Sequence, residues 1–193
     1  IITEEAQRAL FEKLDRLQSG DTLVLAGSIP NTLPDDIYER IMAHLEGRGI
    51  RIVVDATKNL LRRVLKYRPF LIKPNNHELG EMFGVVLKTD DEIVAHAKKL
   101  QEEGAENVLI SMAGDGAILL TREGVFYRSA APKGTLVNSV GAGDSMVAGF
   151  LAGFMESGGS YERAFYMGVA AGSASAFSPN LATREEALAL LKT

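Results

Sequence analysis

Residues 22–55 read TLVLAGSIPNTLPDDIYERIMAHLEGRGIRIVVD, and this stretch decides the fold class. Thr22–Ala26 is a short, continuously apolar run, which is typical of a strand buried on both faces. Pro34–Arg48 carries apolar residues four positions apart, the spacing of a helix with one face on a core. Ile50–Asp55 is a second apolar run. A strand, a helix and a strand joined by short connections predict two neighbouring parallel strands.

The same alternation continues on both sides of this stretch. Sequence patterns predict further helices over residues 4–18, 59–66, 76–83, 89–103, 142–156, 161–177 and 184–191. They predict further strands over residues 70–73, 107–111, 124–129 and 134–138. Val108–Thr121, with Gly114-Asp115-Gly116 at its middle, is typical of a hairpin. We therefore expect a single α/β domain with a mostly parallel central sheet flanked by helices.

The composition narrows the class of protein. Of the 193 residues, 46% are apolar and 24% charged, ordinary values for a globular domain with a sizeable core. The net charge of -4 gives no basic field for nucleic acid or an acidic membrane surface, so neither is expected as a partner. The absence of cysteine excludes disulfides and thiolate metal sites and favours the cytoplasm. The first residue is Ile1 rather than Met, so we expect the later part of a longer protein.

Ligands of such a sheet gather where the strands end and loops lead into helices. Four segments are predicted to follow strands in this way: Gly27-Ser28, Lys73–Glu78, Ser111–Gly116 and Asn138–Asp144.

The segment Asn138-Ser-Val-Gly-Ala-Gly-Asp144 has two glycines before a helix. Glycines allow a tight turn, and the N–H groups at a helix start suit a phosphate or the charge on a transferring phosphoryl group. The alternative is a glycine-rich helix start whose acid stabilises the first turn, and the motif alone does not choose. A carboxylate beside a phosphate weakens binding, whereas a site that deprotonates a hydroxyl needs one, so Asp144 favours catalysis. Farther along, Gly149 and Gly153 are expected to pack that helix onto the sheet.

The other three segments have weaker patterns. Asn75 and Glu78 stand three apart, so they could hold Mg²⁺ through waters, although a helix cap with its capping-box partner fits the spacing better. Ser111–Gly116 fits a plain hairpin better than a nucleotide site along the strand ends. Gly27-Ser28 offers an amide and a hydroxyl to a substrate. There is no Gly-x-x-x-x-Gly-Lys-Ser/Thr motif, which excludes a P-loop enzyme.

Three segments together resemble a known family. Asn138–Gly149 resembles the second signature of the PfkB (ribokinase-like) carbohydrate kinases. Lys73–Glu78 resembles that family's Asn-x-x-Glu motif for magnesium and phosphate, and Ser111–Gly116 is similar to its nucleotide-binding strand and turn. They occur in the family's order and at its usual separations. Lys133–Asn138 and Gly168–Ser178 are most similar to members that act on fructose 1-phosphate.

The resemblance implies a three-layer, ribokinase-like α/β fold that is incomplete here. The family has a preceding segment with the first strands, a small lid sheet and most sugar contacts. Residues 1–193 would then be the C-terminal, nucleotide-binding and catalytic portion.

The resemblance also implies a role for each candidate residue. Asp144 would be the base that also touches the sugar, and the amides of Gly141, Ala142 and Gly143 would form the anion hole. Glu78 and Asn75 would hold Mg²⁺ through water, and Gly27 and Ser28 would contact the phosphosugar. The nucleotide would contact Ser111, Met112, Ala113, Gly114, Asp115, Gly116, Asn75 and Gly143.

The implied reaction is that of a phosphotransferase with an alcohol acceptor: ATP and fructose 1-phosphate give fructose 1,6-bisphosphate and ADP. The implied cofactors are ATP, Mg²⁺ and a monovalent cation such as K⁺, and the implied assembly is a homodimer of the full-length protein. Alternatives are tagatose-6-phosphate kinase, another sugar kinase of the family, or a nucleotide-binding module without catalysis. A nicotinamide-dependent oxidoreductase is a third class, although Met146 stands where its fingerprint needs a glycine.

Overall fold

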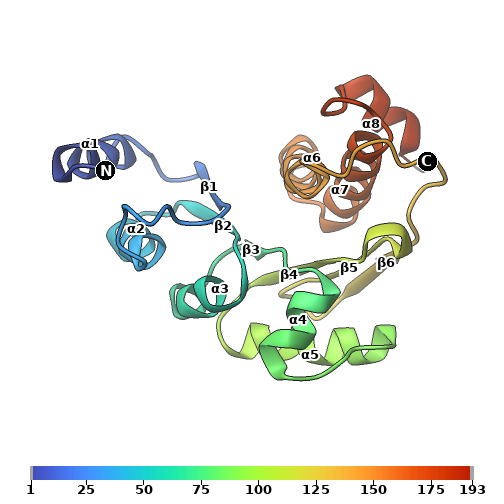
Figure 1. The fold of residues 1–193 in the computed structure, drawn as a ribbon, viewed down its shortest axis with the longest axis horizontal. Helices are drawn as coiled ribbons and strands as arrows, with labels where there is room; N and C mark the ends of the chain where they lie inside the picture. The colour runs from blue at the N-terminus through green and yellow to red at the C-terminus, as the bar shows by residue number, and fades with distance from the viewer. Residues whose placement is uncertain (1, 192–193) are drawn as a thin grey trace. The chain divides into compact units, whose positions relative to one another are not determined.

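The computed structural model describes residues 2–191, and the chain splits into two compact units, Ile1–Val108 and Leu109–Thr193 (Figure 1). The strand order of the sheet is β1-β2-β3-β4-β5-β6, so β1 and β6 are its edges. Strands and helices alternate through the first unit, and helices dominate the end of the second. The expected α/β class is therefore confirmed.

The first unit contains three of the predicted parallel strands and the first two residues of a fourth, β4. β1 (Thr22–Ala26), β2 (Arg51–Asp55), β3 (Leu71–Ile72) and β4 (Asn107–Ser111) pair in parallel, with Val24 opposite Val53 in the register. Val53 and Val54 of β2 are fully buried, as the apolar run predicts. The helices of this unit are α1 (Glu4–Leu14), α2 (Ile37–Leu45), α3 (Lys58–Val64), α4 (Asn76–Phe83) and α5 (Asp90–Glu102), with a 3-10 turn at Leu65–Tyr67.

Helix starts with capping residues lie where the sequence predicts them. Thr3 accepts a hydrogen bond from the Ala6 N–H, and Asn75 and Thr89 each form a full capping box at the start of α4 and α5. α4 has the predicted bounds because Asn75 caps its start and Gly84, at φ +67°, ends it in the left-handed conformation.

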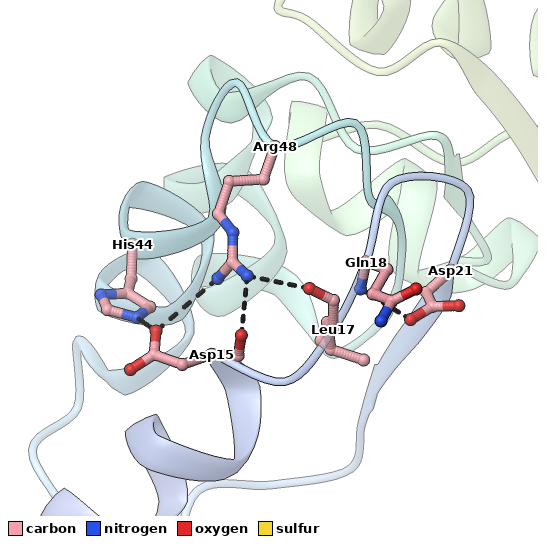
Figure 2. A network of polar contacts seen from close by, with 6 residues as sticks. All are labelled: Asp15, Leu17, Gln18, Asp21, His44 and Arg48. Carbon is pink, nitrogen blue, oxygen red and sulfur yellow. Dashed lines mark hydrogen bonds and ion pairs between the residues drawn. The ribbon is translucent and has the colours of Figure 1, made fainter.

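α1 ends at Leu14, four residues before the predicted end, and a polar network holds the chain that follows (Figure 2). The Arg48 guanidinium donates to the carbonyl oxygens of Asp15 and Leu17 at 2.9 and 2.8 Å. His44 Nε2 lies 2.6 Å from Asp15 Oδ1. His44 in α2 and Arg48 after it therefore hold the connection between α1 and β1.

The second unit joins an antiparallel strand pair to three helices. β5 (Ala117–Leu120) pairs antiparallel with β6 (Phe126–Ser129), and a 3-10 turn, η2 (Ala113–Asp115), precedes β5. α6 (Ala142–Glu156), α7 (Tyr161–Ala176) and α8 (Arg184–Leu190) gather in one group in Figure 1. α7 touches both other helices, and the Phe165 ring of α7 lies 6.1 Å from the Tyr127 ring of β6.

Residues 134–138 do not form the predicted strand. This segment instead runs along the end of α7, where the Val137 N–H donates to the Ala176 carbonyl at 2.8 Å and Gly134 packs on the Phe177 ring. Its backbone partner is a helix carbonyl, so the segment is extended without joining the sheet.

The glycines of α6 pack against α7 rather than onto the sheet. A Cβ added at Gly149 would lie 2.6 Å from both Ala171 Cβ and the Met167 carbonyl oxygen. A Cβ at Gly172 would lie 3.0 Å from the Ala142 carbonyl oxygen. Small residues on both helices therefore allow the two backbones to approach closely. In the part of the chain that the structure describes, no helix is long and apolar enough to span a membrane.

Candidate functional site

The predicted phosphoryl-transfer motif forms a tight turn, Gly141–Asp144, at the start of α6; we call it the glycine turn. Gly141 is the N-cap residue and has φ +77°, a conformation that favours glycine. The next residues begin a helix of 15 residues, whose first N–H groups have no partners within the helix. The glycine turn therefore offers amide donors and the positive end of a helix dipole, as an anion site requires.

Asp144 is the third residue of α6 and is exposed to solvent. No other residue between 2 and 191 forms a hydrogen bond or ion pair with its carboxylate. An exposed carboxylate without a protein partner remains available to accept a proton from a bound hydroxyl. The same position also suits an acid that stabilises the first helical turn, so the geometry is compatible with both interpretations.

The segment before the glycine turn is held to α7. The N–H groups of Val137 and Asn138 both donate to the Ala176 carbonyl, at 2.8 and 3.1 Å. Asn138 Oδ1 then accepts the Val140 N–H at 3.0 Å, which turns the chain toward Gly141. Leu181 lies over Gly141, because a Cβ added to Gly141 would be 2.5 Å from Leu181 Cδ2.

Ser111–Gly116 forms the turn between β4 and β5. The Met112 N–H donates to the Gly116 carbonyl at 2.8 Å, and Ala113 and Gly116 both have positive φ, at 47° and 96°. Ala113, Gly114 and Asp115 are exposed, whereas Met112 and Gly116 are buried. The segment is the tight turn that the hairpin pattern predicts, and its contact with a nucleotide remains a prediction.

Asn75 and Glu78 form the capping box at the start of α4. Asn75 Oδ1 accepts the Glu78 N–H at 2.8 Å, and Glu78 Oε2 accepts the Asn75 N–H at 2.9 Å. The amide and the carboxylate thus lie side by side at a helix start, each with one oxygen already used. The sequence left a cap and a magnesium site as alternatives; the cap is present, and the second role remains a prediction.

Gly27 and Ser28 follow β1 and are exposed. The Gly27 N–H donates to the Asp55 carbonyl at 3.0 Å, so these residues lie beside the end of β2. The Tyr38 hydroxyl donates to the carbonyl oxygens of Ala26 and Gly27 at 2.7 and 3.2 Å. Burial, and then the negative charge of Asp55, raise the pKa of Tyr38, which keeps this hydroxyl protonated as a donor.

The sequence analysis missed a charged pair beside these residues. Lys73, after β3, and Asp55, at the end of β2, lie with Nζ and Oδ1 3.3 Å apart. The lysine side chain is only 9% exposed and that of the aspartate 18%. The pattern that could have found them is a charged residue ending each of two apolar strand runs, in IRIVVD and FLIK.

The two units each contain part of the predicted site. The first brings together Gly27, Asp55, Tyr38 and Lys73 at the carboxyl ends of β1–β3, with Asn75 and Glu78 following. The second contains the glycine turn and Ser111–Gly116. Among residues 2–191, no group of three or more His, Cys, Asp or Glu could form a metal site by itself.

Comparisons with known proteins agree with these motifs. The model of the pfkB family carbohydrate kinases matches residues 2–188. The chain is 51% identical over 184 residues to the 1-phosphofructokinase of Bacillus subtilis strain 168, covering 95% of this chain and 60% of that protein. It is 37% identical to the D-tagatose-1-phosphate kinase of Bacillus licheniformis, covering 94% of this chain and 59% of that protein.

Solved structures show the same relationship. A structure of Escherichia coli phosphofructokinase-2 in complex with substrates and products superimposes with a TM-score of 0.90 at 28% identity. The match covers 97% of this chain and 62% of the other. Arabidopsis thaliana ribokinase shares the fold, with a TM-score of 0.75 at 22% identity over 89% of this chain and 56% of that one. The chain spans about three fifths of the length of the curated relatives. From the glycine turn, the Asn75–Glu78 pair and these matches, we conclude that the chain belongs to the PfkB family of carbohydrate kinases.

Proposed function

We propose that residues 1–193 are the C-terminal, nucleotide-binding and catalytic portion of an ATP-dependent kinase that converts fructose 1-phosphate to fructose 1,6-bisphosphate. The observation that carries the proposal is the glycine turn, where a solvent-exposed carboxylate stands in the first turn of a 15-residue helix. The N–H groups at that helix start lie beside it, and the one of Ala142 donates to the Ser139 carbonyl at 3.2 Å. A helix start built only to bind phosphate gains nothing from that carboxylate, whereas a kinase needs a proton acceptor there.

In this proposal, the oxygen of the sugar hydroxyl bonds to the γ-phosphorus of ATP. Asp144 accepts the proton that this hydroxyl loses. The bond from that phosphorus to the bridging oxygen of ADP breaks, and ADP leaves with the electron pair. The amides of Gly141 and Gly143 donate to the equatorial phosphoryl oxygens, where negative charge must be stabilised in the transition state. The Ala142 amide joins them by exchanging its Ser139 carbonyl partner for a phosphoryl oxygen. Because these donors belong to a helix start, they are oriented before the reaction begins.

Asn75 and Glu78 fit a magnesium ion by their chemistry. Mg²⁺ prefers oxygen ligands and usually keeps several waters while it binds one or two carboxylates and the substrate phosphates. The pair offers an amide oxygen and a carboxylate at one helix start, and Glu78 Oε1 is not used in the capping box. When bound, Mg²⁺ would neutralise charge on the ATP phosphates. Ser111–Gly116 is proposed for the nucleotide, and Gly27 and Ser28 for the phosphosugar.

The choice of sugar rests on the relatives. The names of those at 51% and 37% identity specify fructose and tagatose, and both relatives act on a 1-phosphate. We place fructose 1-phosphate first because the identity is higher, and D-tagatose 1-phosphate is the alternative. A structure of E. coli phosphofructokinase-2 is described in complex with potassium, and another as a tetrameric inhibited form. We therefore also propose a monovalent cation requirement and a homo-oligomer, and a cytoplasmic location for the kinase.

The test is Asp144→Asn in the product of the full coding sequence. Asparagine keeps the shape and cannot take the proton, so kcat should fall about 10²–10⁴-fold. ATP binding, measured by calorimetry, should persist. The assay follows ADP release with fructose 1-phosphate, fructose 6-phosphate, tagatose 1-phosphate and tagatose 6-phosphate, each in K⁺ and in Na⁺.

Asp91→Asn is the matched control, because Asp91 is an exposed acid in the first turn of α5. If Asp144→Asn lowers only the melting temperature, as Asp91→Asn should, then Asp144 merely stabilises its helix and the base assignment fails. ATP binding without turnover of any sugar phosphate by the unaltered protein would instead indicate a non-catalytic nucleotide-binding module.

A further inference from the structure

The carboxylate of Asp144 is positioned by the backbone of the glycine turn alone. Within residues 2–191, no side chain or N–H group forms a hydrogen bond or ion pair with it. In many sites, a second residue orients the base by a hydrogen bond. Whatever fixes the backbone of this turn therefore also fixes the proton acceptor.

The last turn of α7 fixes that backbone on both sides. Before the glycine turn, Val137 and Asn138 donate their N–H groups to the Ala176 carbonyl. After it, Ser175 Oγ donates to Ser145 Oγ at 2.7 Å. Two consecutive residues of α7 thus hold the chain as it enters and as it leaves the glycine turn.

Ser175 both donates and accepts a hydrogen bond through its hydroxyl and is only 2% exposed. A hydroxyl has one proton to donate and two lone pairs to accept. Ser175 gives its proton to Ser145, and its oxygen accepts the Ala182 N–H at 2.9 Å. Ala182 follows Leu181, whose side chain lies over Gly141. One buried hydroxyl therefore connects the start of α6 with the loop that covers the glycine turn.

We propose that Ser175 is a positioning residue for the reaction: through Ser145 and Ala182 it holds the glycine turn, and with it Asp144, in the geometry that accepts the proton. This inference rests on the proposed kinase function. Removing the Ser175 hydroxyl leaves the Ser145 hydroxyl and the Ala182 N–H without this partner, so the start of α6 and the covering loop can shift. A shift of about 1 Å at a reacting group can lower a rate about 100-fold.

The test compares Ser175→Ala, Ser145→Ala and the double variant in the product of the full coding sequence. Each single variant should lower kcat at least about tenfold while both KM values change much less, because substrate binding does not depend on proton transfer. The double variant should be no slower than Ser175→Ala, because Ser175→Ala already removes both the bond to Ser145 and the bond from the Ala182 N–H. Ser145→Thr keeps an acceptor oxygen and should recover most of the rate.

Ser129→Ala is the matched control. Ser129 is also buried in this unit, but its hydroxyl donates to the carbonyl of the adjacent Ala130. It should lower the melting temperature as much as Ser175→Ala does, with kcat unchanged. Equal kcat for Ser175→Ala and the unaltered protein would overturn the positioning role, as would additive losses in the double variant.

Amide hydrogen exchange separates this inference from the proposed function. In Ser175→Ala, exchange should accelerate at Ala182 and Ser145 and stay unchanged in β5, whether or not the protein is an active kinase. If the unaltered protein phosphorylates no sugar, the proposed function fails, and with it the role of Ser175 in positioning a catalytic base. If the protein is active but exchange at Ala182 and Ser145 is unaltered in the variant, only the Ser175 inference fails.

Discussion

A lysine that is buried this deeply needs a partner for its charge, and Lys73 has one in Asp55. Removing a charge from water costs several kcal/mol, which an ion pair and further hydrogen bonds must offset. The pair lies at the carboxyl ends of β2 and β3, the part of a parallel sheet where ligands bind. Its ammonium group is therefore both a structural charge and a candidate contact for a phosphate.

Lys73→Met should lower the free energy of unfolding by about 3 kcal/mol, the lower end of the cost of breaking a buried pair. Methionine keeps the length of the side chain but removes the ammonium group that pairs with the Asp55 carboxylate. Urea unfolding at pH 7 measures the loss. Asp55→Asn/Lys73→Met should be more stable than Lys73→Met alone, because the double variant also removes the carboxylate that has lost this ion pair. A double variant that is less stable would show that the two side chains contribute separately.

At the scale of single residues, the sequence predicted local signals well and long-range pairs poorly. Asn75 and Glu78 are three residues apart, and their capping box depends only on that spacing. Asp55 and Lys73 come from different strands and meet only because β2 pairs with β3. The sequence shows a charged residue at the end of each apolar run but not that the two strands are neighbours, which is why the pair was missed.

The predicted helix starts agree with the structure to within one residue for every helix except α2, whereas α1 ends four residues before its predicted end although Thr3 caps its start. α4 and α6 have the predicted bounds, because Asn75 and Gly141 mark their starts. α2 was predicted over 34–48 but covers Ile37–Leu45, and no side chain caps its start. The predicted strand at 134–138 was wrong because its hydrogen-bond partner is α7, a tertiary contact that overrides local pattern.

The packing of α6 on α7 depends on glycine at four positions: Gly149, Gly153, Gly168 and Gly172. Gly172→Ala is the sharpest test among them. Its Cβ would lie 3.0 Å from the Ala142 carbonyl oxygen and 3.2 Å from Met146 Cβ, so the helices must separate by a few tenths of an ångström. We expect a loss of about 1–3 kcal/mol in unfolding free energy, measured with urea.

Ala148→Ser provides the control for Gly172→Ala, because Ala148 is on the exposed side of α6. It should change stability by less than about 0.5 kcal/mol. A Gly172→Ala protein as stable as the unaltered one would mean that the two helices can move apart freely.

An ion-pair cluster connects α2 with α3 and the turn that follows. Glu39 lies 2.8 Å from Lys66 Nζ and also pairs with Arg63. Hydrogen bonding to Lys66, with the Arg63 contacts, lowers the pKa of Glu39 although burial opposes the shift. A carboxylate with a lowered pKa stabilises the fold above its unfolded-state pKa, and this contribution is lost as the pH falls through the folded-state pKa.

Glu39→Gln should therefore lower the melting temperature at pH 7, on the order of 1–2 °C because the cations are exposed. The difference should shrink as the pH falls below the ordinary pKa of glutamate, about 4.3, and disappear once the pH is below the lowered folded-state pKa of Glu39. Thermal scans from pH 3 to pH 8 measure the melting temperatures of the variant and of the unaltered protein. Glu12→Gln on α1 is an exposed control. A difference as large at pH 3 as at pH 7 would show that the Glu39 charge is not responsible.

At the scale of the whole molecule, the two edges of the sheet differ in how well they are protected against pairing with another strand. β6 carries Arg128, whose guanidinium donates to the carbonyl oxygens of Asp115 and Ser129. β1 reads TLVLA and has no charged residue, and Val24 is 40% exposed. Charges discourage edge-to-edge pairing, so β1 is the edge open to another strand. The α/β class was predictable from the strand–helix alternation, but the position of each strand in the sheet depends on tertiary pairing.

The hydrogen bonds of β1 allow this edge to be blocked without disturbing β2. Asp21 accepts the Arg51 N–H and Gly27 donates to Asp55, so odd-numbered residues of β1 face β2. The outer edge of β1 then carries the N–H and carbonyl groups of residues 22, 24 and 26.

Proline at 24 thus removes only an outward N–H, whereas proline at 23 breaks the pairing with β2. We expect residues 1–193 expressed alone to associate with increasing concentration, and Val24→Pro to remain monomeric with a similar melting temperature. Sedimentation velocity measures the association, and Leu23→Pro, which should unfold, is the control for register. If the Val24→Pro chain associates as strongly as the unaltered chain, the contact does not lie at the outer edge of β1.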